Sequence, residues 1–165
     1  MDNKICFALR VYNIAEKYDV NKVLVHEIIS EYISFTKSTL LNGERIDFIG
    51  LLYIEPDITV KKYKSTLGYT CKLISDDLGL PTNTVYIIVK EYLLSLKEGL
   101  FQGKTAEIRG IVTIHPLMTD DKITNIHSAI STSIRRYINE NDCVINSVRV
   151  HTYKSLKEEI KNGCI

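Results

Sequence analysis

Residues 42–55, NGERIDFIGLLYIE, and residues 102–115, QGKTAEIRGIVTIH, carry one pattern sixty positions apart. The match extends without a gap over segments 11–58 and 71–118. It includes two glycines and a proline, residue types that interrupt secondary structure. The first-copy residues that recur unchanged are Ile14, Val25, Ile28, Glu31, Tyr32, Lys37, Leu40, Gly43, Gly50, Ile54 and Pro56. Repeated units of this kind bury their apolar faces against one another, so the sequence predicts two packed copies of one module.

Each copy is predicted to contain two helices followed by a strand. In the first copy a short helix over 8–18 ends near Asp19, and Asp19 or Asn21 caps a second helix. Gly43 and Gly103 each follow a helix, where glycine adopts the left-handed conformation. The second helices carry apolar stripes at helical spacing, made of Val25, Ile28, Ile29, Tyr32, Ile33, Thr36 and Leu40 and of Val85, Ile88, Val89, Tyr92, Leu93, Leu96 and Leu100. We expect Tyr32 and Tyr92 to be core or interface anchors rather than platforms for stacking bases.

The residues that follow the second copy predict new elements. An inserted helix over 120–141 is indicated by isoleucines near helical spacing, namely Ile123, Ile126, Ile130, Ile134 and Ile138. Residues 143–153 are predicted as a strand and 155–162 as a C-terminal helix, and a further strand is expected over 58–64. The expected fold is α+β, with a first module over 1–66 and a second over 67–165. The isoleucine stripe exceeds what one sheet needs, so it is a candidate assembly surface.

The order of two helices, a glycine and a strand of the form GE-x-I resembles the bacterial HU/IHF family. The matching pieces are NGERIDFIGLLYIE (42–55) and QGKTAEIRGIVTIH (102–115), and VRVHTYKSLKEEIKNG (148–163) is similar to the family's last strand and helix. The family forms an intertwined dimer. The resemblance therefore implies two tandem HU/IHF-like modules packed as a pseudo-dimer within one chain.

The same resemblance fails at the DNA-bending arms. The family bends DNA with two β-ribbon arms, each with a proline wedge near its tip. No Arg-Asn-Pro tip occurs here, and Pro56, Pro81 and Pro116 fall at strand ends or a helix start. After Pro116 the arm position is assigned to the helix predicted over 120–141. The resemblance implies the fold without the arms.

Charge identifies the candidate nucleic-acid contacts. The net charge of +1 is low for a dedicated duplex binder. Lys61, Lys62 and Lys64 form the densest basic run, and Arg135 and Arg136 form the second. These side chains could contact phosphates. The lysines would equally serve to prevent pairing at an exposed strand edge.

The sequence carries no catalytic or metal-binding motif. The four histidines lack metal-ligand spacing, although His115 and His151 would be neighbours if their strands paired. No nucleophile elbow or phosphate-binding loop is present. We therefore expect neither an enzyme nor a cofactor. The cysteines form no CxxC pair, as in a reduced intracellular protein. No signal peptide or membrane span is expected.

Two functions from different classes remain. The first is a structural assembly protein that acts with other protein subunits, in a virion or the host-cell cytoplasm. It is similar to IHF-like proteins of tailed, crAss-like phages, which implies a ring or connector at the head–tail junction. The second is an HU/IHF-type architectural protein that binds duplex DNA weakly and without sequence preference. The near-neutral charge and missing arms favour the first function. Neither a membrane nor a small-molecule substrate is expected.

Overall fold

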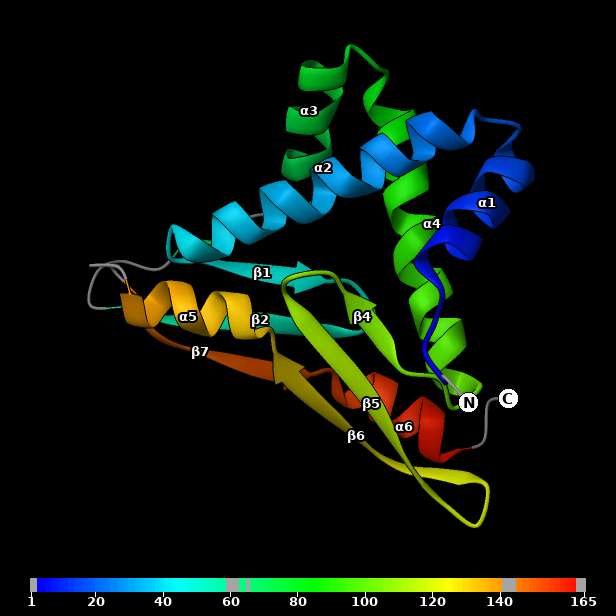
Figure 1. The fold of residues 1–165 in the computed structure, drawn as a ribbon, viewed down its shortest axis with the longest axis vertical. Helices are drawn as coiled ribbons and strands as arrows, with labels where there is room; N and C mark the ends of the chain where they lie inside the picture. The colour runs from blue at the N-terminus through cyan, green and yellow to red at the C-terminus, as the bar shows by residue number, and fades with distance from the viewer. Residues whose placement is uncertain (1–2, 59–62, 65, 141–144, 163–165) are drawn as a thin grey trace.

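A computed structural model describes residues 3–58, 63–64, 66–140 and 145–162 of the chain. The described part is a mixed α+β structure of six helices and two sheets. The helices within residues 7–101 gather on one side of the sheets, whereas those over 132–140 and 154–161 lie beside the strands (Figure 1).

The first half begins with α1 (Phe7–Tyr18) and α2 (Lys22–Leu41). The side chain of Asn21 accepts a hydrogen bond from the amide of Val23 and so caps α2, which leaves Asn21 as the cap of the two candidates. Gly43 follows α2 with a φ of 90° and allows the turn into β1 (Glu44–Phe48). Strand β2 (Leu52–Ile58) then pairs antiparallel with β1.

The second half repeats these elements sixty residues later. They are α3 (Leu67–Leu78), α4 (Thr82–Phe101), β4 (Ala106–Ile108) and β5 (Val112–Thr119). The strand registers also correspond, because Ile46 faces Ile54 in the first half and Ala106 faces Ile114 in the second. Thus the sequence repeat is a repeat of secondary structure and of strand pairing.

A further strand pairs with the second strand of each hairpin. Strand β6 (Lys122–Ile130) pairs with β5, and β7 (Ile145–Thr152) pairs with β2. The helix predicted over 120–141 is therefore wrong in its first half. Asp120 and Asp121 have φ values of 50° and 60° and form the tight turn of a β5–β6 hairpin. This hairpin stands where the sequence predicted a helix in place of an arm.

A bulge explains why the isoleucine spacing resembled a helix. The β5–β6 register shifts between Leu117 and Met118, which face Asn125 and Ile123. The extra residue on β6 changes the alternation by one, so Ile123 and Ile126 are both buried although three positions apart. Spacing of three residues is typical of a helix only where the strand is regular.

The helix that ends each half packs on the other half. Helix α5 (Thr132–Glu140) follows β6 but packs on β7, whereas α6 (Lys154–Lys161) follows β7 but packs on β6. At the start of each half, Lys4 bridges Thr105 next to β4, and β3 (Tyr63–Lys64) pairs parallel with β1. Part of the strand expected over 58–64, residues 59–62, lies outside the described residues.

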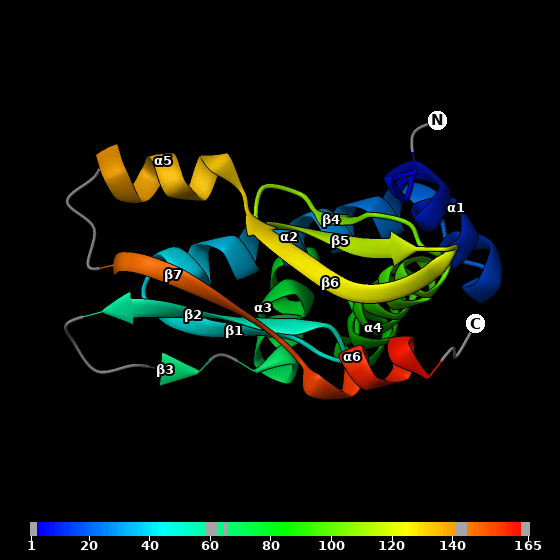
Figure 2. The same cartoon turned by 90° about the horizontal axis from the view of Figure 1, so that it is seen from below.

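One hydrophobic core runs through both halves. Tyr32 and Tyr92 are 2% and 1% exposed, which confirms them as core anchors. The Tyr32 ring meets the Phe48 ring edge to face, with centroids 6.4 Å apart. Helices α2 and α4 thus cover the inner faces of the sheets, and the view from below shows the strands in front of these helices (Figure 2).

Candidate partner-binding and nucleic-acid interface

The outer face of the first sheet is built by strand alternation. Successive side chains of a strand point to opposite faces. Ile46 and Ile54 are buried beneath the helices, so their neighbours Arg45 and Tyr53 lie on the outer face, where they are partly exposed. Strand β7 adds His151 to the same face, because His151 faces Tyr53 in the ladder.

Planar side chains stack on this face in a group that we call the ring cluster, comprising Arg45, Tyr53, His151 and Tyr153. The Arg45 guanidinium carbon lies 3.8 Å from the centre of the Tyr53 ring. The His151 ring stacks on Tyr53 at 4.7 Å with an interplanar angle of 15°, and the Tyr153 ring lies 5.5 Å away. Stacked aromatic and cationic groups offer a rigid contact surface.

Carboxylates lie beside the ring cluster. The Tyr153 hydroxyl donates a hydrogen bond of 2.5 Å to Oδ2 of Asp47. Burial, followed by this bond, raises the pKa of Tyr153 to about 12, so the phenol stays a neutral donor. His151 Nε2 lies 3.7 Å from Oε2 of Glu55. A face with acceptors beside its donors is poorly suited to phosphate.

The outer face of the second sheet carries small side chains at the matching positions. Thr105 stands where the first half has Arg45, and Thr113 where it has Tyr53. Ala129 faces Thr113 in the ladder as His151 faces Tyr53. The two outer faces therefore share a backbone frame but differ in chemistry, and the second lacks aromatic rings at these positions.

A groove of about 600 Å³ lies where β6 meets β7. Its lining includes His127, Lys154 and Lys157 together with rings of the ring cluster. The hydroxyl oxygens of Ser128 and Thr152 approach to 3.5 Å and link β6 to β7. Lys154 and Lys157 were missed in the sequence, because only the contact of α6 with the other half brings them to this groove.

The candidate nucleic-acid contacts do not form one described surface. Lys61 and Lys62 lie outside the described residues, as does the side chain of Lys64. Arg135 and Arg136 are exposed on α5. Figure 2 shows α5 near the beginning of β7 and α6 after its end, so these arginines are remote from the basic groups of α6.

The candidate assembly surface is not exposed. Four of its residues are at most 9% exposed and the fifth is partly buried against the core, in the order Ile123, Ile126, Ile130, Ile134 and Ile138. The first three belong to β6 and the last two to the face of α5 that packs on the other half. These side chains close the core within one chain, so a surface for assembly must lie elsewhere.

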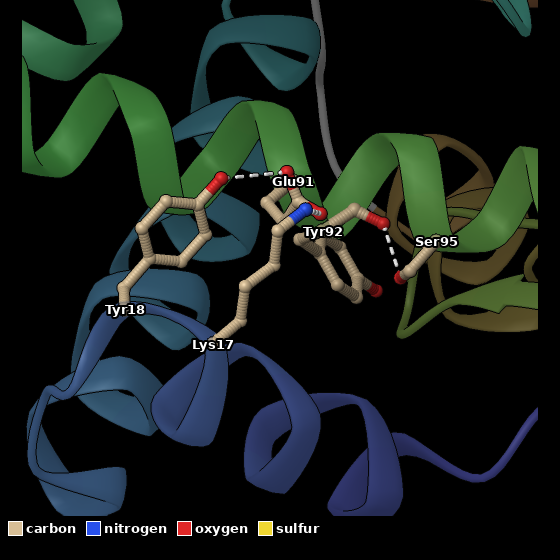
Figure 3. Close-up of polar contacts among 5 residues, drawn as sticks. All are labelled: Lys17, Tyr18, Glu91, Tyr92 and Ser95. Carbon is tan, nitrogen blue, oxygen red and sulfur yellow. Dashed lines mark hydrogen bonds and ion pairs between the residues drawn. The ribbon is translucent and has the colours of Figure 1, made fainter.

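A polar contact joins α1 to α4 (Figure 3). Lys17 Nζ lies 2.6 Å from Oε1 of Glu91, and the Tyr18 hydroxyl donates to Oε2 of Glu91 at 2.9 Å. Burial tends to raise the pKa of Glu91, but these hydrogen bonds outweigh it and lower the pKa. In the other half Asp77 takes the place of Lys17. There burial, and then the charge of Asp77, raises the pKa of Glu31.

The histidines are placed differently from the sequence expectation. His115 faces His127 in the β5–β6 ladder, whereas His151 faces Tyr53, so His115 and His151 are not ladder partners. Within the described ranges, no group of three or more histidine, cysteine or acidic side chains could hold a metal ion. No helix in that part of the chain has the length and apolar character needed to cross a bilayer.

Comparison of the chain with models of protein families, with curated proteins and with solved structures found no match.

Proposed function

We propose that the chain consists of two tandem HU/IHF-like modules packed as a pseudo-dimer. The corresponding registers of β1–β2 and β4–β5 support this arrangement. The reciprocal exchange of terminal helices supports it further, because an intertwined dimer places the end of each module on its partner. In this proposal the first module includes β7 and α6 at the end of the chain, and thus extends beyond the range 1–66.

We propose further that the protein is a non-enzymatic structural protein, a component of a ring or connector such as that at a phage head–tail junction. The observation that carries this proposal is the β5–β6 hairpin. It occupies the place of a DNA-bending arm, but its tip is formed by Asp120 and Asp121. Two carboxylates at the tip repel phosphates, and the one proline of the hairpin, Pro116, lies within β5, away from the tip.

A second observation supports a structural role over DNA binding. Carboxylates lie among the hydrogen-bond donors of the first outer face, with Asp47 bonded to Tyr153 and Glu55 near His151. On the other outer face, Thr105, Thr113 and Ala129 stand at the positions of Arg45, Tyr53 and His151 and carry no charge. A protein that wraps DNA needs many cations that face phosphate, since counterion release dominates its affinity.

The alternative is weak, non-specific binding of duplex DNA. The exposed Arg135 and Arg136 on α5 favour it, as do Lys154 and Lys157 beside the groove between β6 and β7. In that case the affinity should be weak, because few phosphate contacts are available, and it should fall further as salt is raised from about 50 to 200 mM, because each contact releases counterions.

The two functions are separated by the mass of the native protein with and without nuclease. We expect an assembly whose mass does not change on nuclease treatment. Duplex binding is measured in parallel by fluorescence anisotropy, with the variant Arg135→Gln and Arg136→Gln as the matched control. Nanomolar binding at physiological salt that this variant abolishes, or loss of the assembly on nuclease treatment, would reverse the order of the two functions.

A further inference from the structure

A hollow of about 530 Å³ lies between α1 and the beginning of α2. We call it the α1–α2 groove. Phe7 and Val11 contribute to its lining, together with Tyr12 and Val23, which are 52% and 60% exposed. Large apolar side chains exposed side by side mark a site for a partner more often than scattered ones do.

The α1–α2 groove also has a charge. Lys22 and Arg109 contribute to the lining, and no carboxylate is among the described residues that line it. The Arg109 guanidinium lies over the Phe7 ring at 4.0 Å, so a cation stands directly beside the apolar surface. Such a groove fits a segment that presents an apolar side chain next to carboxylates.

The internal repeat shows that the apolar character of this groove is not required by the fold. At the equivalent positions of the second half, Tyr12 is replaced by Lys72 and Val23 by Asn83, and both are exposed. The same helical hairpin thus forms there with polar side chains. The exposed apolar side chains of Tyr12 and Val23 occur in only one of the two modules. Folding therefore does not explain their presence.

The tip of the β5–β6 hairpin has the complementary chemistry. Leu117 is 47% exposed and precedes the turn residues Asp120 and Asp121. The two carboxylates outnumber the single cation of the turn, Lys122. The residue of β2 equivalent to Leu117 is Asp57, so the exposed leucine is again specific to one half.

We propose that the hairpin tip of one copy of this chain docks into the α1–α2 groove of a second copy. Leu117 enters between Tyr12 and Val23, and the carboxylates of the turn approach Lys22 and Arg109. A copy cannot fill its own groove, because the hairpin tip and α1 lie far apart along the long axis of the molecule (Figure 1). The contact joins two different surfaces and is therefore head to tail, the geometry that generates rings or filaments.

This inference rests on the proposed structural role and specifies how the subunits would join. One hairpin tip buries less than the about 1,200 Å² of a stable interface, so a single contact should be weak, with a Kd of about 0.1 mM. Closure of a ring would strengthen it, because the last contacts are intramolecular.

The test uses two variants of the full chain. The groove variant carries Tyr12→Lys and Val23→Asn, the residues of the other module. The hairpin variant carries Leu117→Ser with Asp120→Asn and Asp121→Gly, because Asn-Gly is the favoured sequence for such a turn. Circular dichroism checks that both remain folded. Tyr69→Lys removes an exposed ring outside the groove and serves as the control.

Sedimentation velocity over a concentration series gives the result. We expect the wild type and the Tyr69→Lys control to self-associate, and each of the two variants to do so at least about tenfold more weakly. An equimolar mixture of the two variants should form a dimer and nothing larger, since one intact groove meets one intact hairpin.

A monomeric wild type at every concentration, variants that associate like the wild type, or a mixture that stays monomeric would each overturn the docking proposal. These outcomes leave the structural function standing if the protein associates through another surface. Nuclease-sensitive assembly would instead overturn the structural function, so the two failures are distinguishable.

Discussion

Gly99 in α4 lies against Ile5 of the N-terminal segment, and replacing it by alanine tests the exchange of ends between the two halves. A Cβ at position 99 would stand 2.3 Å from Cδ1 and 2.7 Å from Cγ1 of Ile5. Carbon atoms in contact are separated by about 3.5–4.0 Å. The added methyl group therefore cannot enter unless Ile5, which is 7% exposed, moves.

Two effects of opposite sign set the magnitude. Alanine is more favourable than glycine within a helix by about 1 kcal/mol. Overpacking of a filled core costs about 1–3 kcal/mol. Because the overlap here exceeds 1 Å, we expect the upper part of that range and a net loss of about 1–2 kcal/mol for Gly99→Ala. In an Ile5→Ala background the space is vacant, and the same change should stabilise the protein by up to about 1 kcal/mol.

Urea unfolding monitored by far-UV circular dichroism provides the measurement, since the chain contains no tryptophan. The wild type, the two single variants and the double variant form a cycle whose coupling energy isolates the contact. Ile5→Ala alone should cost about 2–4 kcal/mol, because it removes a buried side chain. If the slope of the unfolding free energy against urea concentration is the same for the four proteins, their denatured states are comparable.

The sign of the effect of Gly99→Ala decides the outcome. Stabilisation in the wild-type background would mean that the N-terminal segment does not pack on α4 in solution. An equal loss in both backgrounds would mean that another neighbour limits the site. Either result refutes the reasoning that the first residues of the chain complete the second half.

Three further predictions concern other sites. Asp77→Lys should restore opposite charges beside Glu31 and raise the free energy of unfolding at pH 7 by about 0.5–1 kcal/mol. The raised pKa of Glu31 means that the fold favours the protonated side chain. The stability that Glu31 contributes is therefore present at low pH and is lost as the pH rises through its folded pKa. The benefit of Asp77→Lys should thus disappear below about pH 4, and equal gains at pH 3 and pH 7 in urea titrations would contradict this cause. Ile134→Asp should unfold the chain, because Ile134 is 0% exposed. A native circular dichroism spectrum, together with a monomer by sedimentation velocity, would instead make α5 a candidate assembly surface. Gly103→Val should lower the urea midpoint at a cost of about 1 kcal/mol or more, because φ is 77° there, whereas a wild-type midpoint would argue against strain at this turn.

The local structure of the repeat could be predicted from the sequence because short-range rules govern it. Asn21 caps α2 through its own side chain, and Gly43 and Gly103 supply the positive φ values that end two helices. The apolar stripes identified the buried faces of α2 and α4. Each of these signals depends on residues within one or two turns of one another. It can therefore be recognised in the sequence without knowledge of the rest of the fold.

Strand β6 could not be recognised in the same way, whereas β7 lies within the strand predicted over 143–153. Ile123, Ile126 and Ile130 are spaced as in a helix because a bulge opposite Leu117 and Met118 shifts the strand by one residue. Only pairing with β5 shows where the bulge falls. The buried isoleucines were therefore assigned to the wrong element and to the wrong role.

The surfaces on which the proposed functions depend are formed only in the tertiary structure. The ring cluster joins the consecutive strands β1 and β2 to β7, which lies far along the chain. The α1–α2 groove is completed by Arg109 from the other half. The repeat alone determined that two like modules exist and which helix faces are buried. The exchange of their ends, the acidic hairpin tip and the exposed side chains of one half arise from long-range packing, because burial depends on which distant residues meet.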